Sequence, residues 1–141
     1  MSHRATTIGC ILAILFGLAH LAGHVVFFGA EQATPQLAAG RAAMLAATVE
    51  TAGMGTSRWA LFLFFSLSLA IGSLAFGILG LATMRASLQA PAVARAVAFV
   101  GIGFALALLA AGAAHRVLQP IVAGCVLTVC FVAGLRPTRR I

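Results

Sequence analysis

The sequence predicts an all-α integral membrane protein, a four-helix bundle with an additional interfacial amphipathic helix between the first and second spans. Hydrophobic residues make up 62% of the 141 residues and charged residues only 8%, whereas soluble domains carry about a quarter charged residues. The apolar residues form four runs, each close to the ~20 residues that cross a hydrocarbon core. We therefore expect a single transmembrane domain over residues 1–141.

The first span is expected over residues 7–29. It follows a short basic start, as the core of a signal peptide would, but its apolar run continues to Phe28 and is longer than such a core. We therefore expect a retained helix and not a cleaved signal. Residues three and four apart share one helix face, and a face with ionisable groups is expected to turn toward protein. The residues on that face are Gly9, Ala13, Gly17, His20 and His24.

The interfacial helix is expected over residues 35–52. Thr34 can cap its start, and Pro35 suits the first helical position. The segment is rich in Ala, which favours helix, but it is too polar to span and should lie on the membrane surface. Gly53 and Gly55 are expected to end it.

The other spans are expected over residues 57–83, 92–114 and 118–135. Trp59 stands near the start of the second span, where its amphipathic ring suits the membrane interface. Small side chains at helical spacing let neighbouring backbones approach closely. The residues expected to form such packing faces are Gly17, Ser66, Ser73, Gly77 and Gly80.

Four spans put both termini on one side of the membrane. All nine basic residues are Arg and the net charge is +7. Because these arginines are dispersed at the ends of apolar segments, we expect membrane lipids as partners and no nucleic acid. The excess of Arg on one side predicts cytoplasmic termini in a bacterial inner membrane. That side would hold Arg4, Arg85, Arg95, Arg136, Arg139 and Arg140; the other would hold Arg41, Arg58 and Arg116.

The same topology gathers most of the ionisable residues toward the outer end of the bundle. One interpretation is structural: the histidines form hydrogen bonds between helices. A second is cofactor binding, since imidazole is a common ligand of transition metals and haem. A third is proton transfer on a lipid-soluble substrate by His24 with Glu31 or Glu50. The candidate residues are His20, His24, His115, Glu31, Glu50, Arg58 and Arg116.

The cofactor interpretation assigns different roles to different histidines. His20 and His24 lie on one helix face and could jointly hold a metal ion. The same pair could not be the two opposite axial ligands of one haem b, so His24 would pair with His115 from another helix. Haem ligation by a single histidine, His20 or His24, is the other arrangement. Arg58 or Arg116 could then neutralise the propionates.

Three short motifs resemble a known group of proteins. They are Gly17-Leu-Ala-His20, Trp59 with Phe65-Ser66-Leu67-Ser68, and Gln119-Pro120-Ile121. In these motifs and its layout the chain is similar to small bacterial four-helix membrane proteins grouped as DoxX-like. The resemblance implies a fold and no established activity, and no functional residue is carried over from it.

Two functional hypotheses follow. The first is a non-catalytic accessory subunit or self-associating bundle in a membrane complex, with a protein partner or a second copy of itself. The alternative is a haem- or metal-binding membrane protein, an isomerase or oxidoreductase acting on a lipid-soluble substrate, that uses His20, His24 and His115.

Overall fold

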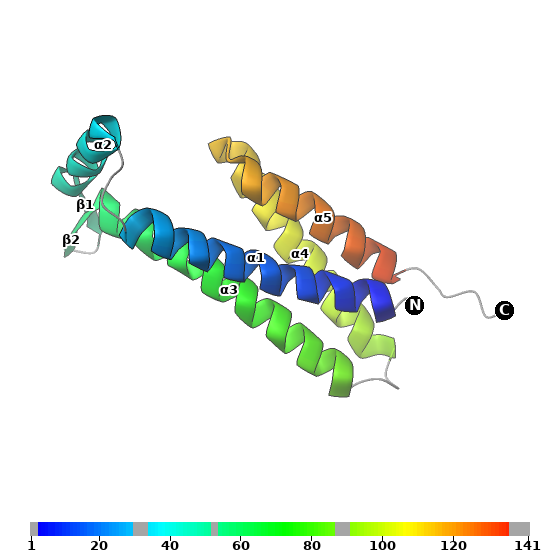
Figure 1. The fold of residues 1–141 in the computed structure, drawn as a ribbon. Coiled ribbons are helices and arrows are strands. Elements are labelled where there is room, and N and C mark those ends of the chain that lie inside the picture. Colours follow the sequence, from blue (N-terminus) through cyan, green and yellow to red (C-terminus); the bar gives the residue numbers. More distant parts are fainter. Residues whose placement is uncertain (1–2, 30–33, 52–53, 87–90, 136–141) are drawn as a thin grey trace. The chain divides into compact units, whose positions relative to one another are not determined.

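A computed structural model describes residues 3–29, 34–51, 54–86 and 91–135 (Figure 1). Within these residues four helices are long and apolar enough to cross a membrane. The predicted all-α membrane fold with an interposed short helix is therefore confirmed, and the chain is a multi-pass membrane protein. The elements in order are α1 (His3–Gly29), α2 (Pro35–Ala46), β1 (Thr48–Thr51), β2 (Met54–Ser57), α3 (Arg58–Ala86), α4 (Pro91–His115) and α5 (Leu118–Leu135).

The connection between α1 and α3 differs from the prediction. The helix expected over residues 35–52 ends at Ala46, and β1 and β2 form an antiparallel pair with Thr48 opposite Ser57. Ala47 already has an extended backbone, and the β-branched residues that follow favour strand over helix. The start of α2 is as predicted, since Thr34 Oγ1 accepts a hydrogen bond from the Leu37 N–H at 3.3 Å.

The contacts within the chain define two compact units. Unit 1 comprises residues 1–16 and 73–141, and unit 2 comprises residues 17–72. Both α1 and α3 cross the boundary, so each contributes one part of its length to each unit.

Unit 1 has a core of small residues around a few aromatic rings. The Phe76 ring stacks on Phe104 at 5.0 Å between centroids and meets Phe131 edge-on at 5.7 Å. Phe131 is fully buried. Other buried apolar residues of this unit are Cys10, Ala13, Met84, Ala94, Val97, Ala98, Ala105, Leu108 and Leu127.

Glycines bring the helices of unit 1 into backbone contact. A Cβ atom on Gly77 would lie 2.6 Å from the Cys10 carbonyl oxygen, and one on Gly80 would lie 2.6 Å from Cys10 Sγ. Between α5 and α4, a Cβ on Gly124 would lie 2.7 Å from the Ala105 carbonyl oxygen. Gly77 and Gly124 accept no larger residue without a shift, because the obstacles include backbone atoms, whereas the obstacle at Gly80 is the Cys10 side chain.

A tight turn joins α4 to α5. Arg116 has a left-handed backbone (φ 55°). Its N–H donates to Ala113 O at 3.3 Å, and the N–H of Val117 donates to Gly112 O at 2.9 Å. This pair of bonds is the Schellman motif that ends many helices, usually with glycine at the left-handed position. A Cβ on Gly112 would lie 2.9 Å from the Ile121 nitrogen, so the two helices meet closely at this turn.

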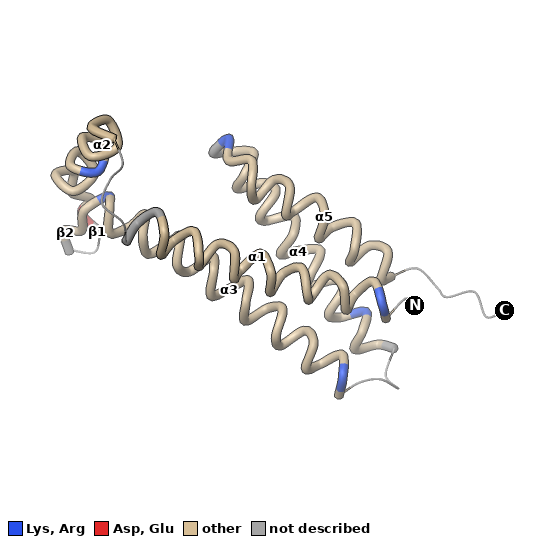
Figure 2. Tube along the Cα trace, viewed as in Figure 1, with Lys and Arg blue, Asp and Glu red and all other residues tan. Residues whose placement is uncertain are grey.

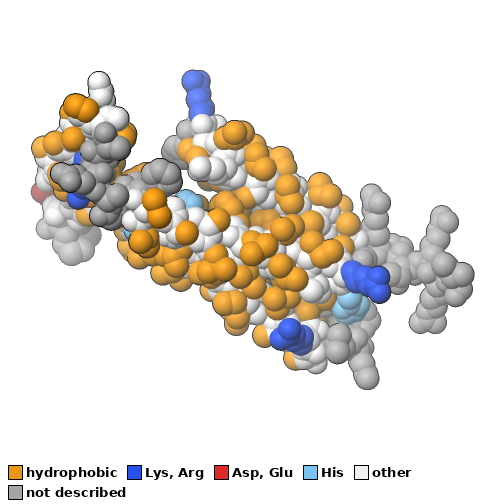
Figure 3. Space-filling view, in the orientation of Figure 1, with side chains coloured by type: hydrophobic (Ala, Val, Ile, Leu, Met, Phe, Trp, Pro, Cys, Tyr) orange, Lys and Arg blue, Asp and Glu red, His pale blue; other side chains and the backbone are white. Residues whose placement is uncertain are grey.

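Charge and hydrophobicity are separated along the long helices. The described Arg residues of these helices stand at or near helix ends (Figure 2), whereas hydrophobic side chains cover most of the visible surface between them (Figure 3). Such a surface is what lipid requires of a membrane protein.

Candidate functional site

The polar site of unit 2 consists of two histidines and a serine. His20 Nε2 lies 3.1 Å from Ser66 Oγ, and His24 Nδ1 lies 3.1 Å from the same oxygen. The histidines are one turn apart on α1, and Ser66 belongs to α3. A single hydroxyl therefore links two imidazoles across two helices, and all three side chains are half-buried.

The hydrogen-bonding capacity of serine matches this arrangement. A hydroxyl donates once and accepts twice, and a neutral imidazole has one donor and one acceptor nitrogen. Ser66 can therefore donate to one ring and accept from the other, with two opposite tautomer assignments that are equally allowed. Both histidines can be neutral and still satisfy the hydroxyl, which lowers the cost of placing them in a membrane span.

Local structure at the start of α3 sets the position of Ser66. The Ser57 side chain caps the helix, with its Oγ accepting the Ala60 N–H at 3.2 Å. The N–H of Arg58 donates to Ala47 O at 2.8 Å, which ties the start of α3 to the end of α2. The hairpin and the cap together set where α3 begins, and Ser66 follows two turns later.

A cation–π contact lies elsewhere in unit 2. The Arg41 guanidinium carbon of α2 is 5.2 Å from the centroid of the Trp59 ring, and Trp59 contacts Phe62 at 5.9 Å. This contact occupies Trp59, the residue whose ring was expected at the membrane interface. The interfacial position of α2 stays a prediction.

The other candidate residues are distributed over both units. Glu50 of β1 is exposed and pairs with Gly55 across the hairpin, and Arg58 is exposed at the start of α3; both belong to unit 2. His115 ends α4 and Arg116 follows it, exposed, in unit 1. Glu31 lies outside the described residues. The structure therefore brings together His20 and His24, with Ser66 as an addition.

The described residues supply few metal ligands at this site. No three His, Cys, Asp or Glu side chains come together within residues 3–29, 34–51, 54–86 and 91–135. Protein metal sites take three or four ligands, whereas this site offers two imidazoles and a hydroxyl. A metal bound here would need a ligand from Glu31 or from another molecule.

The predicted packing residues occupy two kinds of position. Gly17, Ser73, Gly77 and Gly80 are buried, and the last two lie against Cys10 of α1. Ser66 differs, because it serves as a hydrogen-bond partner. The sequence offered three serines in this apolar run, Ser66, Ser68 and Ser73, and no local signal that separates Ser66 from the other two.

Comparisons with known proteins leave the chain without an assigned relative. No family model, no curated protein and no solved structure matches it. The resemblance to DoxX-like proteins therefore stays a prediction.

Proposed function

We propose that this chain is a non-catalytic membrane protein that works by helix association, forming a complex with a second copy of itself. The observation that carries the proposal is an exposed stripe of small residues on α4, at spacings that keep them on one face. We call it the α4 stripe. Its members, all exposed, are Gly103, Ala107, Ala110 and Ala114. Ala92 and Ala96 are exposed on the same face nearer the start of α4, but the large exposed side chains of Phe99 and Val100 separate them from the stripe.

The two faces of α4 differ in what covers their glycines. A Cβ on Gly101 would lie 2.7 Å from the Phe131 ring, so this face is filled by the chain itself. A Cβ on Gly103 would meet nothing within 4 Å. Since small residues in membrane helices allow close approach of a second helix, the open face of α4 suits a partner helix.

A second open face lies on α3. A Cβ on Gly72 would meet nothing within 4 Å, and Gly72 is exposed, as are Ser68 and Ala75 at the adjacent turns. The histidine pair supports the same functional class, because a hydroxyl within the chain already binds both rings. An accessory subunit of a larger complex would use the same faces.

The test is the monomer–dimer equilibrium in lipid vesicles, measured by energy transfer between labelled chains. Gly103→Leu places a bulky side chain in the α4 stripe and is expected to weaken the dimer about tenfold. Gly72→Leu tests the α3 face in the same way. Val129→Leu is the matched control, because Val129 is 69% exposed on α5. It lies outside both the α4 stripe and the open face of α3.

Two results would contradict self-association. One is a chain that stays monomeric at every protein-to-lipid ratio; the other is an equal effect of Gly103→Leu and Val129→Leu. A monomer that copurifies in fixed stoichiometry with another membrane protein would assign the accessory role in place of the dimer.

The proposed location is a bacterial inner membrane with both termini in the cytoplasm. At one end of unit 1 stand Arg4, Arg85 and Arg95, and at the turn between α4 and α5 stands Arg116. Over the whole sequence, six arginines are assigned to the side of the termini and three, Arg41, Arg58 and Arg116, to the other side. This excess supports that orientation by the positive-inside rule. A reporter that works only in the cytoplasm, fused after Ile141 so that Arg136, Arg139 and Arg140 are kept, should be active. An inactive reporter, with a reporter that works only outside the cytoplasm active at the same point, would exclude the orientation.

The alternative function is haem or metal binding at the histidine pair. The convergence of His20 and His24 on one hydroxyl favours it, because it keeps two imidazoles close together. The test is an absorption spectrum with elemental analysis of the purified protein. A Soret band or stoichiometric metal that is lost in His20→Ala or His24→Ala, but kept in His3→Ala, would favour this alternative over the accessory role. A colourless, metal-free, folded protein would exclude it.

A further inference from the structure

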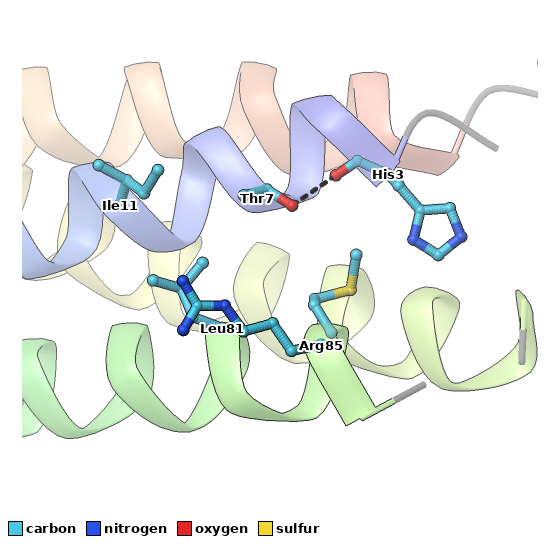
Figure 4. A pocket seen from close by; sticks show the side chains of 6 residues that line it. His3, Thr7, Ile11, Leu81 and Arg85 are labelled. Atoms are coloured by element: carbon cyan, nitrogen blue, oxygen red, sulfur yellow. Dashed lines mark hydrogen bonds between the residues drawn. The ribbon is translucent and has the colours of Figure 1, made fainter. Parts of the chain in front are cut away.

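A small pocket lies between the start of α1 and the end of α3, entirely within unit 1 (Figure 4). Its volume is about 160 Å³. Apolar side chains from both helices form part of its wall, and nitrogen-bearing side chains stand at its sides. The lining residues are His3, Thr7, Ile11, Leu81, Met84 and Arg85.

The polar groups of this pocket lack a partner of opposite charge. His3 Nδ1 is buried and has no hydrogen-bond partner in the described part of the chain, which is costly for a polar atom. Arg85 is exposed and adds a permanent positive charge. Residues 1–16 and 73–141 contain neither Asp nor Glu. An anion from outside unit 1 would neutralise the charge of Arg85.

The shape of the pocket indicates what kind of anion fits. In Figure 4 the Arg85 side chain runs from the end of α3 back over Leu81, and the His3 ring lies at the other side. Thr7 Oγ1 donates to the His3 carbonyl oxygen at 2.8 Å, which fixes the first turn of α1. Beyond these groups, Ile11 is 43% exposed and offers an apolar surface along the span.

The depth of the pocket points to a lipid. His3 begins a membrane-spanning helix, and Arg85 stands in the last turn of another. Ends of spans lie at the level of the headgroups, where phosphates are abundant and the guanidinium fork binds their oxygens well. We infer that this pocket binds the phosphate of an anionic membrane phospholipid, with the Arg85 guanidinium on the phosphate and an acyl chain along Ile11.

The experiment measures lipid retained by the full chain in native mass spectrometry after reconstitution with phosphatidylglycerol or with zwitterionic phosphatidylcholine. We expect one phosphatidylglycerol per chain to be retained, and Arg85→Gln to reduce its retention about tenfold. Arg95→Gln is the matched control, because it removes the same charge near the start of α4, from a residue that does not line the pocket. His3→Gln should give a smaller loss than Arg85→Gln.

Three outcomes would overturn the inference. Equal losses in Arg85→Gln and Arg95→Gln would indicate diffuse attraction to anionic lipid and no site. Equal retention of phosphatidylglycerol and phosphatidylcholine would show that the negative charge of the lipid headgroup does not contribute to binding. Displacement of the lipid by inorganic phosphate would indicate a phosphate site without a need for acyl chains.

Discussion

The two parts of α1 hold their neighbours by different means. In unit 1, the helix meets α3 through Gly77 and Gly80, which bring backbones together around Cys10. In unit 2, the same helix reaches α3 through His20 and His24, which share the Ser66 hydroxyl. Lipid offers no hydrophobic drive between helices, so contact has to come either from close packing or from hydrogen bonds. This protein uses one solution in each unit.

The largest expected change in the free energy of unfolding comes from the close-packed contact between α1 and α3 in unit 1. Gly77→Ala puts a methyl group 2.6 Å from the Cys10 carbonyl oxygen and should lower the free energy of unfolding by about 3 kcal/mol, because the backbone has to move. Gly40→Ala in α2 is the control, since its methyl group meets nothing within 4 Å and should stabilise the protein by up to about 1 kcal/mol, the difference in helix propensity between Gly and Ala. Unfolding in mixed micelles measures both, and equal values would refute the packing argument.

A smaller change in the free energy of unfolding is expected at the hydrogen bonds between α1 and α3 in unit 2. Ser66→Ala removes the hydroxyl shared by His20 and His24 and should destabilise the protein by about 1.5 kcal/mol, near the upper end for hydrogen bonds between membrane helices. Ser68→Ala, at an exposed position of the same helix, is the matched control and should be close to neutral. If Ser66→Ala is also neutral, the histidines find other partners and the comparison between the two units fails.

A stabilising change is expected at the turn between α4 and α5. Arg116 holds a left-handed backbone (φ 55°) that costs a non-glycine residue about 1 kcal/mol. Arg116→Gly should therefore raise the free energy of unfolding by about that amount, and Arg116→Ala should not. Thermal unfolding of the two variants tests this, and equal midpoints would show that the left-handed conformation costs nothing here.

The smallest effect is expected at the contact between α2 and Trp59. Arg41→Gln removes the cation 5.2 Å from the Trp59 ring, an interaction worth about 0.5 kcal/mol at exposed sites. Hydrogen exchange should become faster in α2 and stay unchanged in α4. Faster exchange in both helices would mean that the substitution acts on the whole protein and not on this contact.

The spans were predictable because their signal is local. An apolar run of sufficient length has to be helical in lipid, since every backbone polar group needs an internal partner. The cap at Thr34 and the shared face of His20 and His24 follow from spacing alone. These features depend on residues within one or two turns of each other.

The hairpin was missed because two local signals competed. The Ala-rich stretch after Pro35 favours helix, and Gly53 and Gly55 were interpreted as its end. The pairing of Val49 with Thr56 draws on β-branched residues in both strands, which favour strand over helix. The strong helix propensity of the Ala-rich stretch therefore outweighed the weaker strand signal that follows it.

The partner of the histidines was beyond local reasoning. Ser66 was predicted as a packing residue because it is small, and nothing within α3 distinguishes it from Ser73. Its role depends on how the parts of α1 and α3 that belong to unit 2 are aligned along their lengths. Sequence spacing within one helix carries no information about that alignment.

The helices also differ in length, which has a consequence for the surrounding bilayer. α5 has 18 residues and α3 has 29, about 27 Å and 43 Å of helix respectively. A hydrocarbon core of about 30 Å exceeds the reach of α5, so lipids beside it have to shorten or disorder their chains, whereas α3 has length to spare. From this mismatch we expect short-chain lipids to suit the surroundings of α5 better than long-chain lipids do.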